Sequence, residues 1–364
     1  MKLICFFLLI FLQSSTLLAQ LDSASYTYDF GASLHGDTML SIDNTKHLSY
    51  HKPLGFEVTY LRQTDGRKYW EEVQNYPLWG ISLQYFDYRS NILKKMLSLS
   101  LDYRRNIYRG KRGATFIPLG IGLAYTPGYF DIEKNPLNTA IGQPVSFILY
   151  IGILQQIHIN NYWSIDLKLG LTHYSNGGLS APNSGVNLLN TSLGVSRKIQ
   201  QPDFKKNLLP PALDNKLHCL LQVATGAKEV LPTLGRWPFY NATLLFAKNL
   251  NYRHAINIGV DYQYSEALKK EVHFMQTQWF YNSTNDNVPD HQTVSLLGGY
   301  EFKAGKISVP ILLAAHIYKE LDTLPTFYQK IGLRYWFNNL FASITLRSFT
   351  GNSDGIEWGL GFKI

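Results

Sequence analysis

The chain has 364 residues and a formal net charge of +8, with 16% charged and 14% aromatic residues. After the first twenty residues no apolar run reaches the length of about 18 residues that a membrane-spanning helix needs, so the sequence excludes such a helix. Only one cysteine, Cys219, follows that first segment, which also excludes an internal disulfide.

Residues 1–20 have the pattern of a secretory signal peptide. Lys2 supplies the positive charge, residues 4–12 the apolar core and residues 17–19 a cleavage site of the Leu-Leu-Ala type. We therefore expect an exported protein and leave this segment out of the fold.

Residues 21–200 contain eight segments in which apolar and polar side chains alternate with the period of two that a β-strand requires. The expected strands cover residues 28–40, 54–61, 78–88, 96–108, 115–125, 147–159, 163–175 and 186–199. In the fifth of these, Pro118, Gly120, Gly122 and Ala124 share one face, which predicts a narrow barrel interior. A loop rich in Asn, Pro and Gly is expected over residues 126–144.

A connector with three prolines is predicted over residues 201–215, because proline lacks the N–H that a strand ladder needs. Alternation resumes in residues 216–364. The expected strands there cover residues 217–230, 241–250, 255–264, 293–302, 307–318, 328–337, 340–349 and 356–364. Residues 266–292 are polar and predict a loop with a helical turn.

This pattern indicates an all-β, antiparallel transmembrane β-barrel protein with about 16 strands. Two arrangements stay open, namely two tandem eight-stranded barrels or one wide barrel. The two halves end alike, so residues 216–364 are interpreted as a degenerate repeat in which Ser348 and Thr350 stand where the first half has His173 and Ser175. The second half therefore lacks the imidazole.

Three polar residues are predicted to meet on an apolar face at the end of the strand over residues 163–175. His173 and Ser175 continue the outward set of Trp163, Ile165, Leu167, Leu169 and Leu171. If the next strand pairs across the Gly/Ser/Pro-rich turn, Asn187 comes to the same side. An unpaired polar group on a lipid-facing surface is costly, so these side chains are expected to have a function.

The three side chains suit nucleophilic catalysis. A serine hydroxyl needs a base within hydrogen-bond reach, and His173 is two residues away on the same face. Asn187 would orient the imidazole, as the asparagine of Cys-His-Asn enzymes does. Amide groups of Asn176 and Asn183, with backbone N–H groups of the turn around Gly178, are candidate donors to an oxyanion.

The motif His-Tyr-Ser-Asn-Gly-Gly-Leu at residues 173–179, followed by Pro-Asn-Ser-Gly-Val at 182–186, resembles the lipid A 3-O-deacylase (PagL) family of outer-membrane acyl hydrolases. The resemblance extends over roughly residues 25–200. It implies His173 as base, Ser175 as nucleophile, Asn183 at the oxyanion site and Asn176 in support, with the site facing the membrane. The family has a Glu at the position of Asn187.

The favoured hypothesis is therefore an outer-membrane serine esterase that removes an ester-linked 3-hydroxyacyl chain from lipid A of lipopolysaccharide. The alternatives are an outer-membrane phospholipase, whose Ser-His-Asn arrangement is similar, and a non-enzymatic pore or structural barrel with a vestigial site.

No cofactor, metal or nucleic-acid partner is expected, since the ten histidines show no metal-ligand spacing. The expected partners are lipopolysaccharide and outer-membrane lipids, and a homodimer is compatible with the sequence. The expected location is the bacterial outer membrane.

Overall fold

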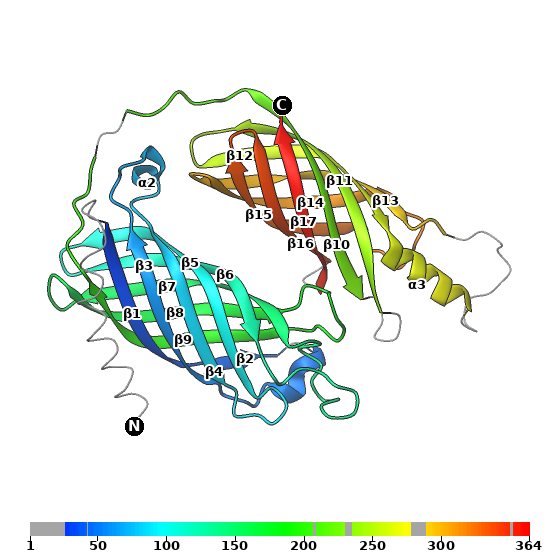
Figure 1. Cartoon of the computed structure of the whole chain (residues 1–364), viewed down its shortest axis with the longest axis horizontal. Coiled ribbons are helices and arrows are strands. Elements are labelled where there is room, and N and C mark those ends of the chain that lie inside the picture. Colours follow the sequence, from blue (N-terminus) through cyan, green and yellow to red (C-terminus); the bar gives the residue numbers. More distant parts are fainter. Residues whose placement is uncertain (1–25, 42, 207–208, 230–234, 278–288, 350–351) are drawn as a thin grey trace.

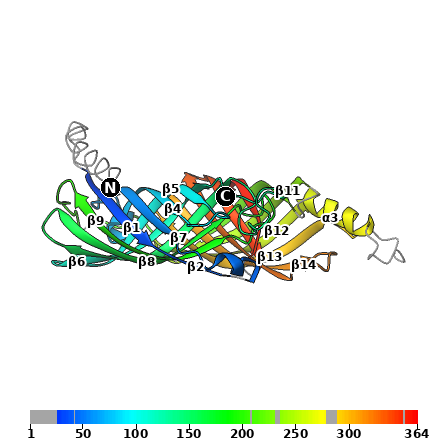
Figure 2. The same cartoon turned by 90° about the horizontal axis from the view of Figure 1, so that it is seen from below.

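In the computed structural model the strands close into two antiparallel β-barrels that lie side by side (Figures 1 and 2). The structure describes residues 26–41, 43–206, 209–229, 235–277, 289–349 and 352–364. The predicted all-β barrel fold is confirmed, and of the two arrangements left open the structure has two tandem barrels. The predicted signal segment, residues 1–20, lies outside the described residues.

The first barrel closes where its first and last long strands pair, with Asp29 opposite Lys198 and His35 opposite Ser192. Its strands are β1 (Thr27–Gly36), β2 (Thr38–Leu40), β3 (Leu54–Gln63), β4 (Leu78–Asp87), β5 (Lys95–Gly110), β6 (Gly113–Tyr125), β7 (Val145–His158), β8 (Trp163–Ser175) and β9 (Val186–Lys198). The short β2 also pairs with β9. The strand expected over residues 28–40 is therefore interrupted at Asp37, whose carboxylate accepts a hydrogen bond from the Thr191 backbone N–H at 3.1 Å.

The second barrel closes between β10 and β17. Its strands are β10 (Leu217–Glu229), β11 (Arg236–Asn249), β12 (His254–Ser265), β13 (Gln292–Ala304), β14 (Ile307–Tyr318), β15 (Phe327–Phe337), β16 (Leu340–Phe349) and β17 (Asn352–Lys363). The largest differences from the expected strands are the starts of β11 and β17, which come earlier in the chain than residues 241 and 356.

The outer faces of both barrels are mainly apolar, and the interiors hold most of the polar side chains together with clusters of apolar ones. On β8, Leu167, Leu169 and Leu171 are exposed while Asp166 and Thr172 are buried. The small residues of β6 do face the interior, where a Cβ on Gly120 would lie 1.9 Å from the Tyr150 ring. An exterior of this kind suits a bilayer, because lipid offers apolar side chains a favourable surface.

Ion pairs fill the interior of the second barrel. Lys330 Nζ lies 2.9 Å from both Asp261 and Glu357, and Arg334 Nη1 lies 3.0 Å from Glu301. All five side chains are almost fully buried. Buried charges are tolerated only when they are paired, so these contacts hold the walls of the barrel to one another.

The two ends of the barrels differ in their connections. At one end, where β1 begins and β17 ends, residues 111–112, 159–162, 305–306 and 338–339 form short turns, and residues 64–77 form a longer connection. Longer segments, including residues 126–144 and 176–185, lie at the other end. Outer-membrane barrels have short turns on the periplasmic side and long loops outside, so the end with residues 176–185 corresponds to the outer one.

In the part of the chain that the structure describes, three helices interrupt the strands, η2 (Asp43–Leu48), α2 (Tyr69–Val73) and α3 (Glu266–Thr277). The expectation of a loop with a helical turn over residues 266–292 is wrong at its start, where α3 is a 12-residue helix with Ala267, Leu268 and Val272 buried. Among the described residues, no helix is long and apolar enough to cross a membrane.

Candidate active site

His173 and Asn187 lie directly opposite each other on β8 and β9, the last hairpin of the first barrel. Their side chains meet on the outer face, with His173 Nδ1 at 2.7 Å from Asn187 Oδ1. A carbonyl oxygen can only accept a hydrogen bond, so Nδ1 of the imidazole carries the proton. The Nε2 lone pair is therefore available to take a proton from another group.

Ser175 is the last residue of β8 and continues the outward set that contains His173. Its side chain is nevertheless covered, with only 7% of the residue exposed. Among the described residues no hydrogen bond joins the Ser175 hydroxyl to His173. The structure thus brings imidazole and amide together and places the hydroxyl beside them without a direct bond. Catalytic hydrogen bonds are often long in the absence of substrate and tighten when substrate binds.

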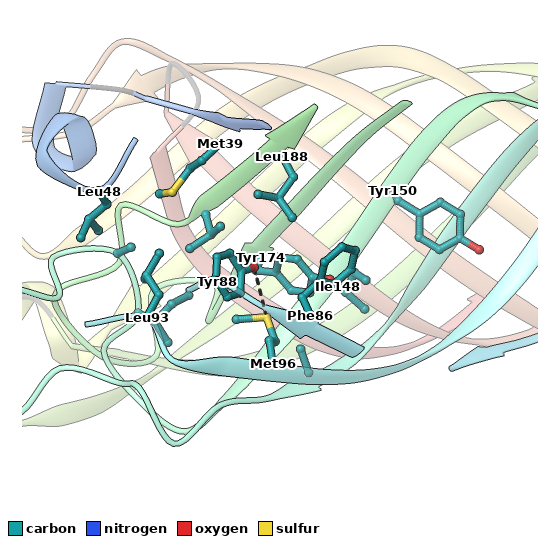
Figure 3. Close-up of a cluster of buried hydrophobic side chains, with 14 residues drawn as sticks. Met39, Leu48, Phe86, Tyr88, Leu93, Met96, Ile148, Tyr150, Tyr174 and Leu188 are labelled. Atoms are coloured by element: carbon teal, nitrogen blue, oxygen red, sulfur yellow. Dashed lines mark hydrogen bonds between the residues drawn. The ribbon is translucent and has the colours of Figure 1, made fainter. Parts of the chain in front are cut away.

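An apolar cluster inside the first barrel fixes which way these side chains face (Figure 3). Tyr174, between His173 and Ser175 in the chain, is fully buried in this cluster together with Tyr88, Phe86 and Met96. Since neighbouring residues of a strand point to opposite faces, an inward Tyr174 requires outward His173 and Ser175. Packing within the barrel therefore sets the geometry of the outer site.

The turn after Ser175 is ordered by the residues expected to donate to an oxyanion. Asn176 is fully buried, and its Oδ1 accepts from the backbone N–H of Gly178 at 3.0 Å while its Nδ2 donates to the Ser180 carbonyl at 2.7 Å. Asn183 Oδ1 accepts from the Asn176 N–H at 2.8 Å. The side chain of Asn176 and the Gly178 N–H thus stabilise the turn itself. Their part in oxyanion binding stays a prediction.

The same turn contacts the second barrel, which the sequence did not predict. The Glu229 carboxylate at the end of β10 accepts hydrogen bonds from Ser180 Oγ at 3.1 Å and from the Ala181 N–H at 2.8 Å. Asn183 Nδ2 donates to Ser353 Oγ on β17 at 2.7 Å. One sequence signal pointed to this contact, since Glu229 is a carboxylate at an outward position of an otherwise apolar alternation.

Apolar side chains lead away from the site along the outside of the first barrel. Leu171 and Leu169 follow His173 on the same face of β8 and are about half exposed. Beyond them lies an open depression of about 590 Å³ on the outer surface. Its apolar lining comes from four neighbouring strands: Leu34, Ile153, Leu167, Leu169 and Leu193. The outer wall on this side of His173 is therefore largely apolar.

The second barrel offers no equivalent of the pair of His173 and Asn187 among its described residues. Ser348, at the position that corresponds to His173, contacts Gln329, and Thr350 lies outside the described residues. A different pair, Ser295 and His316, is buried in the interior, with Ser295 Oγ 2.9 Å from Nδ1. Arg347 donates to Nε2 of that ring, so Nδ1 carries the proton and no nitrogen is left to act as a base.

Within the described ranges, no group of three or more His, Cys, Asp or Glu side chains could hold a metal ion. The expectation that the protein uses no metal or cofactor stays a prediction.

Comparison with protein families gives two matches, one over most of the first barrel and one over the second. Residues 54–196 match the family described as lipid A 3-O-deacylase (PagL), and residues 217–364 match the one described as acyloxyacyl hydrolase, C-terminal domain. A comparison with curated proteins gives no match.

Similar solved structures include Neisserial surface protein A (10% identity, 47% of this chain and 96% of that one, TM-score 0.32). The outer membrane enzyme PagL aligns at 20% identity over 46% of this chain and 97% of that one, with a TM-score of 0.30. The outer membrane phospholipase dimer of Salmonella typhi with bound calcium aligns at 9% identity over 96% of both chains, with a TM-score of 0.20.

Proposed function

Because the chain belongs to the lipid A 3-O-deacylase (PagL) and acyloxyacyl hydrolase family, we propose that its first barrel is a serine esterase of the bacterial outer membrane. Its substrate would be lipid A, from which it removes an ester-linked 3-hydroxyacyl chain. The observation that carries this proposal is the hydrogen bond between His173 and Asn187 on the outer apolar face, beside Ser175.

Each of the three side chains takes part in the proposed reaction. Ser175 Oγ attacks the acyl carbonyl carbon while His173 Nε2 takes its proton, and the C–O bond to the sugar then breaks as the imidazolium returns that proton to the leaving oxygen. Water activated by His173 hydrolyses the acyl-serine ester and releases a free 3-hydroxy fatty acid. Asn187 holds the ring in the tautomer that leaves Nε2 free.

Substrate access supports the proposal as well. The site lies on the outer face at the end with the longer loops, and the leucines of β8 extend from it toward the middle of the barrel wall. A lipid held in the outer leaflet would present its ester at this level, with its chains lying along the leucines. The lipid need not leave the membrane to reach Ser175.

The test is product analysis on purified lipid A in detergent micelles. Mass spectrometry should show loss of one 3-hydroxyacyl group and release of the matching fatty acid with wild-type protein, and neither with Ser175→Ala or His173→Ala. Barrel folding is checked by circular dichroism and by the shift in gel mobility on heating. Equal product from folded Ser175→Ala would remove the proposal.

A phospholipase is the second candidate, favoured by the neutral Asn187 as partner of the histidine. It predicts activity on phosphatidylethanolamine and dependence on calcium, which the same assay can include. A pore is disfavoured by the ion pairs that cross the interior of the second barrel.

A further inference from the structure

We propose that the second barrel is a positioning element for the hydrolytic site of the first, an inference that rests on the function proposed above and deepens it. In this arrangement Glu229, Ser353 and Ile356 hold the turn that follows Ser175. The held turn keeps the end of β8, and with it Ser175, in place on the face that carries His173.

Glu229 is the centre of this contact. It occupies an outward position of β10, on the same face as Leu221 and Val223. An unpaired carboxylate next to lipid would be unfavourable there. Its side chain is satisfied by the first barrel, because the Ala181 N–H and the Ser180 hydroxyl both donate to Oε2. Both donors belong to the turn, so one oxygen of Glu229 joins the turn directly to the end of β10.

The backbone of Glu229 adds a third bond. The ladder between β10 and β17 runs from Leu220 opposite Lys363 to Thr225 opposite Trp358 and is not continued to the end of β10. Past that point the Glu229 N–H donates to the Gly178 carbonyl at 3.1 Å. The Glu229 N–H therefore bonds to the turn of the first barrel at a level where the ladder between β10 and β17 has ended.

Ile356 provides the apolar part of the contact. It shares the outward face of β17 with Trp358 and Leu360, which are 55% and 68% exposed, yet Ile356 itself is only 5% exposed. Gly177 explains the difference, since a Cβ on this residue would lie 2.3 Å from Ile356 Cδ1. Gly177 also has a φ of +68°, which glycine adopts without strain. Packing and backbone geometry both require glycine two residues after the nucleophile.

Ser353 connects the contact to the residue next to Ser175. Its hydroxyl accepts from Asn183 Nδ2, and the other end of the same amide accepts from the Asn176 N–H. A chain of two hydrogen bonds thus runs from β17 to the peptide that directly follows Ser175. Movement of the second barrel at this point would move the backbone of the nucleophile.

A second contact between the barrels lies at the opposite end and serves as a control. Gln74, at the end of α2, donates to the Lys303 carbonyl at 2.9 Å, and the rings of Tyr69 and Tyr252 meet at 4.9 Å between centroids. Breaking this contact weakens the association of the barrels without touching the turn. A variant that breaks this contact therefore distinguishes an effect on the turn from an effect of weaker association between the two barrels.

The experiment compares four full-length variants, Glu229→Ala, Glu229→Gln, Ile356→Ala and Gln74→Ala, in hydrolysis of lipid A micelles with kcat and KM measured separately. Displacement of a reacting group by about 1 Å costs up to about a hundredfold in rate, so Glu229→Ala and Ile356→Ala should lower kcat about tenfold or more with little change in KM. Glu229→Gln keeps an oxygen acceptor and should retain most of kcat. Gln74→Ala should behave as wild type.

Amide hydrogen exchange of residues 176–185, followed by mass spectrometry, gives a readout that does not depend on hydrolysis. The turn should exchange faster in Glu229→Ala than in wild type and Gln74→Ala. Exchange that is equal in all three, or a kcat of Glu229→Ala within about twofold of wild type, would overturn the inference. An active Ser175→Ala variant would instead refute the proposed function, and turn exchange would still test whether the second barrel holds the turn.

Discussion

Removing the amide partner of the imidazole, by Asn187→Ala, is the change whose effect follows most directly from the structure. The bond from His173 Nδ1 to Asn187 Oδ1 is neutral in the resting site. In the transition state the ring becomes an imidazolium, and the bond becomes one to a charged group. Such bonds contribute about 1.5–3 kcal/mol, compared with about 0.5–1.5 kcal/mol for neutral ones.

The substitution removes the neutral bond of the resting site as well, so the barrier rises by the difference between the two, about 1–1.5 kcal/mol. At 1.36 kcal/mol for each factor of ten, kcat should fall about 5- to 13-fold. KM should change little, because Asn187 holds the imidazole and not the acyl chain. The assay is steady-state release of 3-hydroxy fatty acid from lipid A, quantified by mass spectrometry over a range of substrate concentrations.

Leu189→Ala is the matched control, because Leu189 lies two residues further on the same strand and the same outward face. The substitution removes apolar surface from the outer wall. It should therefore raise KM while leaving kcat nearly unchanged. If Asn187→Ala kept a kcat within about twofold of wild type, the orienting role of the amide would be wrong. Asn187→Asp extends the series, since a carboxylate in the same place should raise kcat above the wild-type value.

Three further predictions concern stability and the turn. Tyr174→Ala empties part of the apolar cluster in the first barrel and should lower the free energy of unfolding in urea by about 3–5 kcal/mol. Gly177→Ala should lower kcat and speed exchange of the turn, because the new Cβ collides with Ile356 at a positive φ; unchanged values for both would contradict the packing argument. Lys330→Met removes the cation that is paired with both buried carboxylates, Asp261 and Glu357, and should destabilise the second barrel by about 3–5 kcal/mol at neutral pH, measured by thermal unfolding.

The wall of each barrel could be predicted from the sequence because alternation is a local signal. The outward direction of Leu167, Leu169 and Leu171 follows from their spacing alone, and His173 shares it. The placement of Asn187 followed from alternation in the next strand, once the two strands were taken to pair across the turn.

Closure of the chain into two barrels could not be predicted, because it depends on pairings between distant strands. Asp29 pairs with Lys198 and Leu220 with Lys363, and nothing local to these residues specifies those partners. The contacts of Glu229 and Ser353 with the turn also join residues far apart in the sequence, so they could not be predicted either.

Helix α3 was missed for a different reason, since its composition is polar and only part of one face is buried. A local signal was present, because Ser265 precedes the helix and its hydroxyl accepts from the Leu268 N–H at 3.2 Å. Serine in that position is a preferred N-cap.

The central claim, that Ser175 is the nucleophile, is tested most directly by trapping the acyl-enzyme. Wild-type protein mixed with lipid A and quenched in acid within the first turnover should yield a peptide containing Ser175 that is heavier by one 3-hydroxyacyl group. The adduct should be absent from His173→Ala. An adduct on another residue, or fatty-acid release at the wild-type rate by folded Ser175→Ala, would contradict the claim.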